Sequence, residues 1–174
     1  MEDLHWVFGY GSLIWKHDFP VIEIRRAYIE GWARRFWQGS HDHRGLPTDP
    51  GRVLTLIEAP GEVCQGRALL VESDVFEHLD YREKNGYERH ELTIHFDDGA
   101  VDGITYIAPI NNAAFLGAAP SKDIAAQIRR SKGPSGTNTD YVLELAQALR
   151  ELNIEDAHVF DIEARLRQDN GVDR

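Results

Sequence analysis

The chain has 174 residues, of which 42% are hydrophobic, 28% charged and 10% aromatic, a composition typical of a globular protein and not of a disordered one. Its 19 Lys and Arg residues against 29 Asp and Glu residues give a net charge of −10, which disfavours binding to nucleic acid or to an anionic membrane surface. A chain of 174 residues is too short for two ordinary domains, so we expect one domain over residues 1–174. The single cysteine, Cys64, excludes an internal disulfide and a cysteine-rich zinc site, which fits a reducing compartment, the cytoplasm.

The chain begins with a short strand that runs into a glycine-bearing turn. Residues 6–8 have the aromatic and β-branched character of a strand, and Gly9 and Gly11 flank Tyr10 in the turn that follows. Glycines at these positions allow positive φ and a close approach of the backbone, so successive N–H groups can hold a carboxylate or a developing oxyanion. An ordinary tight turn explains the segment equally well. It fits neither a phosphate-binding loop nor the Gly-x-Ser-x-Gly elbow of serine hydrolases around Ser12.

A run of cationic and aromatic residues, RRFWQGSHDHRG, follows at 34–45. In an acidic chain this run suits a small anionic ligand better than nucleic acid. His41 and His43 are spaced to share one face of a strand as metal ligands, but no third ligand of matching spacing is near. We expect a polar loop here that faces solvent or substrate.

The middle of the chain is rich in strand signals. Short β-branched and aromatic runs occupy 53–57, 66–71, 91–96 and 104–107, separated by turns such as Asp97-Asp98-Gly99. They predict a compact curved sheet, with Cys64 as a buried and inert thiol. The uncharged stretch 103–120 is interrupted by proline and glycine, so we expect a strand and a loop and not a membrane helix.

One helix is expected between these strands. Ser73 is a plausible N-cap, and Phe76 and Leu79 mark a buried face that continues to Glu83 just before the stop signal Asn85-Gly86. Burial and the negative end of the helix dipole would both raise the pKa of Glu83 and make it a stronger base. If the helix ends earlier, Glu83 is instead an ordinary solvated side chain.

The sequence turns helical from Ser121 onward. Ser121 is a plausible N-cap for a helix that buries Ile124, Ala125 and Ile128. After the loop 133–138, a second helix carries an apolar stripe that should pack on the sheet; the stripe consists of Val142, Leu145, Leu149 and Leu152.

Five segments in one order resemble a known family: GYGSLIW at 9–15, RFWQGSHDHRG at 35–45, PGRV at 50–53, YREKNGY at 81–87 and GPSGTNTDY at 133–141. They are similar to the ChaC family of γ-glutamylcyclotransferases, which act on glutathione. The resemblance implies an α+β fold, with a small β-barrel-like mixed sheet flanked by helices and a helical C-terminal part. It also implies cleavage of glutathione to 5-oxoproline and cysteinylglycine.

The resemblance assigns roles to individual residues. Glu83 takes the position of the family's catalytic acid/base. The substrate-binding positions are Gly9, Tyr10, Gly11, Ser12, Leu13, Ile14, Arg35, His43, Arg44 and Tyr141. Among these, Arg35, His43 and Arg44 form the cationic run that would hold the distal glycine carboxylate.

The chemistry of a γ-glutamyl amide fits this small set of residues. The substrate's own α-amine can attack its γ-carbonyl and close a five-membered lactam, so no enzyme nucleophile, metal or cofactor is required. Glu83 would take a proton from the ammonium and return one to the leaving nitrogen. The N–H groups of residues 10–13 would anchor the substrate or stabilise the oxyanion; the sequence leaves both roles open.

Three other functions remain compatible with the sequence. A broader γ-glutamyl-amino-acid cyclotransferase would use the same residues. A non-catalytic regulator of cation transport would bind a ligand without needing Glu83, and a Ser12-based hydrolase would release free glutamate. We expect glutathione as the partner, no nucleic acid or membrane, and a monomer or weak homodimer.

Overall fold

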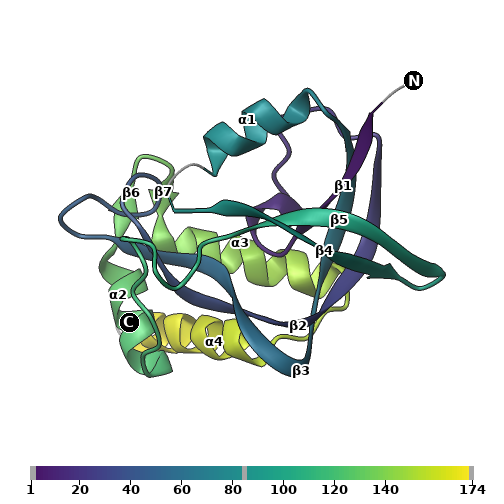
Figure 1. The fold of residues 1–174 in the computed structure, drawn as a ribbon. Helices are drawn as coiled ribbons and strands as arrows, with labels where there is room; N and C mark the ends of the chain where they lie inside the picture. The colour runs from purple at the N-terminus through teal and green to yellow at the C-terminus, as the bar shows by residue number, and fades with distance from the viewer. Residues whose placement is uncertain (1–2, 84–85, 173–174) are drawn as a thin grey trace. The chain divides into compact units, whose positions relative to one another are not determined.

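The computed structural model describes residues 3–83 and 86–172, with side chains described to residue 168. Five strands form a closed barrel in the order β1-β3-β2-β4-β5 (Figure 1). They are β1 (Leu4–Gly9), β2 (Glu23–Ser40), β3 (Gly51–Glu72), β4 (Glu88–Phe96) and β5 (Gly99–Ile107). Antiparallel pairs join β1 to β3, β2 to β4 and β4 to β5, and a parallel pair of β1 with β5 closes the barrel. The prediction of an α+β fold with a barrel-like mixed sheet is confirmed.

Two parts of the strand prediction were wrong. Residues 34–40 belong to the long strand β2, which was not among the predicted strands, and the polar loop expected around His41 and His43 begins at His41. The predicted strands 53–57 and 66–71 are parts of one continuous strand, β3. Cys64 is buried within β3, as predicted. Strands β4 and β5 meet at the predicted turn, where Gly99 has a φ of +155° that only glycine adopts readily.

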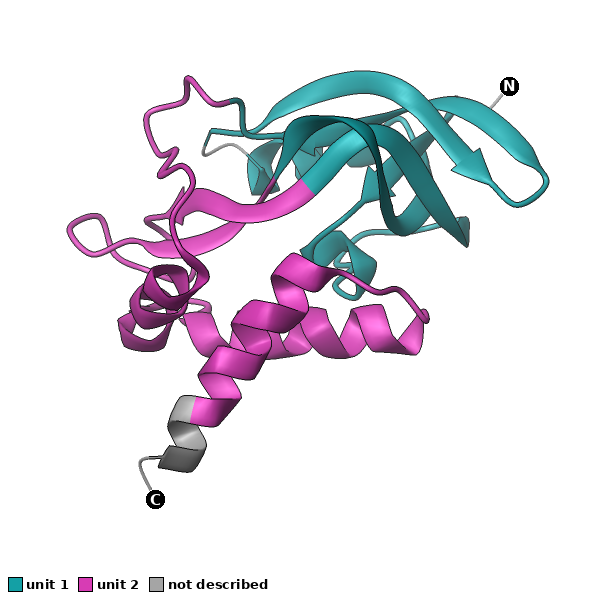
Figure 2. Cartoon of the chain, turned by 90° about the horizontal axis from the view of Figure 1, so that it is seen from below, with its two compact units in different colours: residues 1–33, 56–109 teal, residues 34–55, 110–174 magenta. Residues whose placement is uncertain are grey.

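The chain divides into two compact units, residues 1–33 with 56–109 and residues 34–55 with 110–174 (Figure 2). Strands β2 and β3 contribute to both units. A single domain over 1–174 stays a prediction.

The first unit contains helix α1 (Val75–Arg82), whose apolar face packs on the barrel strands. The core it completes consists of Val7, Leu13, Leu69, Val71, Val75, Phe76, Leu79 and Tyr106. Ser73 is not the N-cap as predicted. Asp74 occupies that position without a side-chain hydrogen bond, and the Ser73 hydroxyl instead donates to the Asp3 carbonyl at 3.0 Å.

The second unit contains α2 (Ser121–Arg130), α3 (Asn138–Glu151) and α4 (Ala157–Val172), with a short hairpin of β6 (Lys132–Gly133) and β7 (Gly136–Thr137) between α2 and α3. The three helices pack against one another. Pro120, not Ser121, is the N-cap of α2, and Thr137 caps α3 by accepting the Asp140 N–H at 3.1 Å. The predicted buried residues are confirmed, except that Leu152 is only half-buried.

Of the stripe on α3 that should pack on the sheet, Val142, Leu145 and Leu149 are fully buried. The same helix contacts β2 directly, because the Tyr141 ring meets the Phe36 ring edge-on at 6.3 Å between centroids. Over the described residues, no helix has the length and apolar character of a membrane-spanning segment.

Candidate active site

The glycine turn after β1 is a short 3-10 helix, Ser12–Ile14, with Gly11 as its N-cap. A side chain at position 9 would place its Cβ 2.8 Å from the Leu13 Cβ, so the predicted need for close backbone approach is confirmed. The positive φ that these glycines allow does not occur here: Gly11 has a φ of −132°, and Gly9 is not among the glycines with positive φ. Glycine is required at position 9 because the turn folds back onto the strand end.

The first backbone N–H groups of this turn form none of the hydrogen bonds within it, because the first donor in the turn is the N–H of Ile14. Ile14 N–H donates to the Gly11 carbonyl at 2.9 Å, and the N–H groups of Trp15 and Lys16 both reach the Ser12 carbonyl. The N–H groups of residues 11–13 are therefore the donors that a helix leaves unused at its start. Such donors carry partial positive charge and suit an anion or an oxyanion.

Two hydrogen bonds join this turn to strands of the barrel. The Tyr10 hydroxyl donates to the Tyr106 carbonyl of β5 at 2.6 Å, and Arg67 of β3 donates from Nη1 to the Ile14 carbonyl at 3.0 Å. These bonds fix the turn to strands β3 and β5, and a site anchored on strands is positioned more precisely than one on a free loop.

Glu83 directly follows α1 as its C-cap, and its N–H donates to the Leu79 carbonyl at 2.9 Å. The helix thus ends one residue earlier than predicted, and Asn85, part of the expected stop signal, lies outside the described residues. Glu83 is nevertheless half-buried. Burial raises the pKa of its carboxyl, as predicted, and the neighbouring Arg82 charge opposes this effect. Its carboxylate forms no hydrogen bond or ion pair with the residues that the structure describes. A poorly hydrated carboxylate of this kind is a suitable base.

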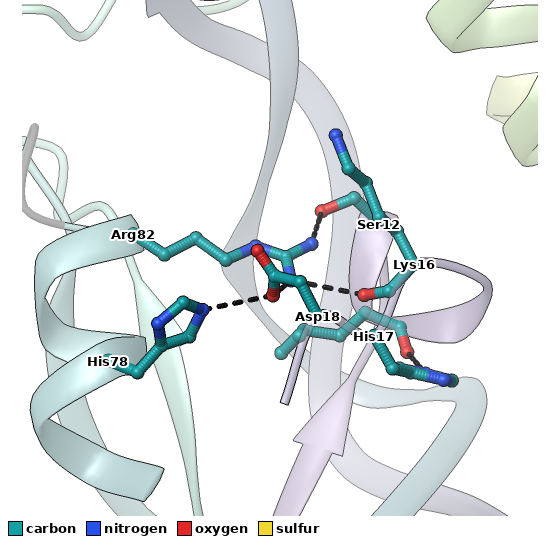
Figure 3. Close-up of polar contacts among 7 residues, drawn as sticks. Ser12, Lys16, His17, Asp18, His78 and Arg82 are labelled. Atoms are coloured by element: carbon teal, nitrogen blue, oxygen red, sulfur yellow. Dashed lines mark hydrogen bonds and ion pairs between the residues drawn. The ribbon is translucent and has the colours of Figure 1, made fainter. Parts of the chain in front are cut away.

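The structure brings the end of α1 and the glycine turn together. Arg82, the residue before Glu83, donates from Nη2 to the Ser12 hydroxyl oxygen at 3.0 Å (Figure 3). Arg82 belongs to the YREKNGY motif, but its contact with Ser12 could not be predicted, because a partner 70 residues away leaves no local pattern.

Arg44 and Tyr141 lie in the second unit and contact each other. Arg44 is buried, and its Nη1 donates to the Thr137 carbonyl at 3.1 Å. Its Nη2 lies 4.0 Å from Glu144, and its guanidinium carbon lies 5.5 Å from the centre of the Tyr141 ring. These contacts tie the loop after β2 to the start of α3, which is a structural role for Arg44.

Arg35 and His43 also lie in the second unit. Arg35 is half-buried in β2 and donates from Nη1 to the Arg34 carbonyl at 2.7 Å. His43 is exposed in the following loop, with Nδ1 3.1 Å from the Ser135 hydroxyl. In the part of the chain that the structure describes, no group of three or more His, Cys, Asp or Glu side chains is arranged to hold a metal ion.

The profile of the ChaC-like protein family matches residues 5–169. The chain belongs to this family. It is 46% identical to "Gamma-glutamylcyclotransferase 2-3" of Arabidopsis thaliana, over 93% of this chain and 88% of that protein. It is 40% identical to "Glutathione-specific gamma-glutamylcyclotransferase 1" of Danio rerio, over 92% of this chain and 88% of the relative.

The ChaC-like fold is also found in a crystal structure of a yeast γ-glutamyl cyclotransferase specific to glutathione. That structure superposes with a TM-score of 0.87 at 31% identity, covering 95% of this chain and 96% of the yeast chain. The family resemblance inferred from the five motifs is therefore confirmed.

Proposed function

We propose that this ChaC-like protein is a glutathione-specific γ-glutamylcyclotransferase, which converts glutathione to 5-oxoproline and cysteinylglycine. The observation that carries the proposal is the 40% identity, over most of both chains, to a relative whose name states this activity. The half-buried carboxyl of Glu83, with its raised pKa, supplies the chemistry that such a reaction needs.

In the first step, Glu83 removes a proton from the α-ammonium group of the substrate, and the freed amine attacks the γ-carbonyl carbon. Burial makes Glu83 a stronger base than an exposed glutamate because its charged form is poorly solvated. The N–H groups of residues 11–13 precede the hydrogen bonds of the turn and are suited to hold the substrate carboxylate or the oxyanion.

In the second step, the oxyanion collapses and the bond from the γ-carbon to the cysteinyl nitrogen breaks. Glu83, now protonated, gives its proton to that nitrogen, and the ring nitrogen loses its second proton to the released amine. The products are then a neutral lactam and an ammonium group, and the carboxylate ends in its starting state. The substrate supplies both the nucleophile and the leaving group. The protein's task is to fold the substrate into the attacking conformation and to help protons move from the attacking nitrogen to the leaving nitrogen.

The geometry of Ser12 does not favour the hydrolase alternative. A serine nucleophile needs a neighbouring base to take its proton. The Ser12 hydroxyl oxygen instead accepts a hydrogen bond from Arg82 at 3.0 Å, and a guanidinium stays protonated in proteins and cannot act as that base.

A cytoplasmic location remains part of the proposal, supported by the single cysteine and by a substrate that is itself a thiol. A monomer or weak homodimer stays a prediction.

The test measures 5-oxoproline and cysteinylglycine released from glutathione by the purified chain. Glu83→Gln should lower kcat by about 10²- to 10⁴-fold while KM changes little, because glutamine keeps the size and shape of the side chain but cannot transfer the proton. Glu77→Gln, the same change at an exposed position of α1, should keep the parent kcat. A Glu83→Gln variant with near-parent kcat would remove Glu83 from the mechanism.

Product and substrate range separate the alternatives. Formation of free glutamate would indicate a hydrolase, and absence of turnover with retained glutathione binding would indicate a regulator. The name of the Arabidopsis thaliana relative does not specify glutathione, so γ-glutamylalanine should be compared directly. Equal kcat/KM for the two substrates would contradict glutathione specificity.

A further inference from the structure

The guanidinium group of Arg82, at the end of α1, binds both the glycine turn and the loop that follows it. Besides its bond to Ser12, Arg82 donates from Nη1 to the Lys16 carbonyl at 3.0 Å and to Asp18 Oδ1 at 3.2 Å (Figure 3). His78, one turn earlier on α1, lies with Nε2 3.0 Å from the same Asp18 oxygen. Three acceptors, the Ser12 hydroxyl of the turn and the Lys16 carbonyl and Asp18 carboxylate of the loop, therefore bind one side chain of α1.

The electrostatics of this contact favour a firm attachment. The Arg82 side chain is only 15% exposed, so its hydrogen bonds are charge-assisted and partly shielded from water. Partial burial opposes ionisation of Asp18, but the His78 hydrogen bond and the Arg82 charge together lower its pKa. The acceptor is thus ionised at neutral pH. A lysine would keep the charge of Arg82 without the planar fork that reaches several acceptors.

A second set of contacts joins the same two segments through β5. The Tyr106 carbonyl accepts the hydroxyl of Tyr10 at 2.6 Å, and the Tyr106 hydroxyl donates to Asp80 of α1 at 2.7 Å. Leu13 of the turn and Leu79 of α1 belong to one buried cluster. The turn and the last turn of α1 are therefore held at one fixed spacing.

We propose that Arg82 is a positioning residue for the cyclisation: it sets the distance between the glycine turn and the carboxylate of Glu83. The inference rests on the proposed function, because this distance affects the rate only if the turn holds the substrate and Glu83 transfers the proton. Arg82 itself transfers no proton. Misplacement of a reacting group by about 1 Å can lower a rate on the order of 10²-fold.

The test compares Arg82→Gln, which removes both charge and fork, with Arg82→Lys, which keeps only the charge. In the purified chain, we expect Arg82→Gln to lower kcat by about 10- to 100-fold with KM within about threefold of the parent. Arg82→Lys should lower kcat to a similar extent. Arg165→Gln, which removes an exposed ion pair to Asp161 on α4, is the matched control and should keep the parent kcat.

The pH dependence of kcat separates charge from geometry. The Arg82 charge lowers the pKa of Glu83, so Arg82→Gln should move the acidic limb of the profile to higher pH. Arg82→Lys should leave that limb near its parent position. The other ionisable groups of the contact, Asp18 and His78, stay in place in both variants. A loss of activity caused only by weaker folding would not move the limb.

A double-mutant cycle keeps the inference testable if Arg82→Gln folds poorly. Asp18→Asn removes the charged acceptor from the loop side, and its effect on kcat should be non-additive with that of Arg82→Lys, because both changes loosen one contact. Circular dichroism shows whether Arg82→Gln is folded, and if it is not, the test uses Asp18→Asn and Arg82→Lys. Additive effects would overturn the inference.

The outcomes distinguish this inference from the function on which it rests. If the unsubstituted chain releases no 5-oxoproline, both fail together. If it is active and Glu83→Gln is inactive, but kcat of Arg82→Gln and Arg82→Lys stays within about twofold of the parent, the positioning role alone is overturned.

Discussion

His158 on α4 should make the stability of this protein fall at mildly acidic pH. Its Nε2 accepts the Phe36 N–H at 3.0 Å, and its ring stacks on the Phe36 ring at 5.7 Å between centroids. Burial and then the Arg35 charge lower the pKa of His158 from 6.5 to about 4. Protonation of Nε2 would destroy its capacity to accept, so the folded chain keeps this imidazole neutral.

The sign and the size of this effect on the free energy of unfolding follow from the linkage between protonation and folding. Because the pKa is lowered in the folded state, the contribution of His158 is complete above pH 6.5 and is lost as the pH falls towards about 4. Between the unfolded and the folded pKa of His158, the protein loses about 3 kcal/mol of unfolding free energy, and about 2 kcal/mol of this loss falls between pH 7 and 5. Carboxylates with lowered pKa values, such as Glu163, lose their contribution only below about 4.5.

Urea unfolding at a series of pH values, followed by circular dichroism, measures this effect. His158→Gln should flatten the loss of unfolding free energy between about pH 7 and 5, because its amide oxygen can accept from Phe36 and does not titrate. His158→Asn should flatten it equally but be about 1 kcal/mol less stable at neutral pH, since its shorter side chain cannot reach. Equal slopes for the parent and His158→Gln would refute the reasoning.

The remaining predictions concern the turn and the cationic run. Gly9→Ala should destabilise the protein by about 1–3 kcal/mol and lower kcat, because the new methyl group would lie 2.8 Å from the Leu13 Cβ; a parent-like melting temperature would contradict the packing argument. Arg35→Gln and His43→Asn should raise KM for glutathione with little change in kcat if they hold the distal carboxylate, and unchanged KM in both would reject that role. Arg44→Gln should instead lower the melting temperature, because its guanidinium is buried and bound to the Thr137 carbonyl; an unchanged thermal unfolding curve would argue against it.

Much of the fold could be predicted because its signals are local. The strand at 6–8, the turn at 97–99 and the buried faces of α2 and α3 each follow from spacing within about ten residues. The raised pKa of Glu83 also followed from a local pattern, a carboxylate continuing the apolar face of a short helix. Its predicted role as acid/base came from the family motifs.

Strand β2 was not predicted, because Arg34, in its second half, has its charged partner far away in the sequence. Its second half carries the cationic run, and a sequence with adjacent arginines predicts an exposed segment. In the structure Arg34 is only 1% exposed, because Asp156 lies 2.9 Å from its Nε. A buried charge is stable only with such a partner, and a partner more than a hundred residues away cannot be read from the pattern around Arg34.

The sequence by itself determined the family, the glycine turn and the carboxylate that ends α1, because short motifs and helical spacing are properties of neighbouring residues. Only the tertiary structure decided which distant groups meet. Arg82 binds Ser12 across 70 residues, and His158 binds Phe36 across 122. The energies of such contacts depend on burial and on distance in space, which exist only once the chain has folded.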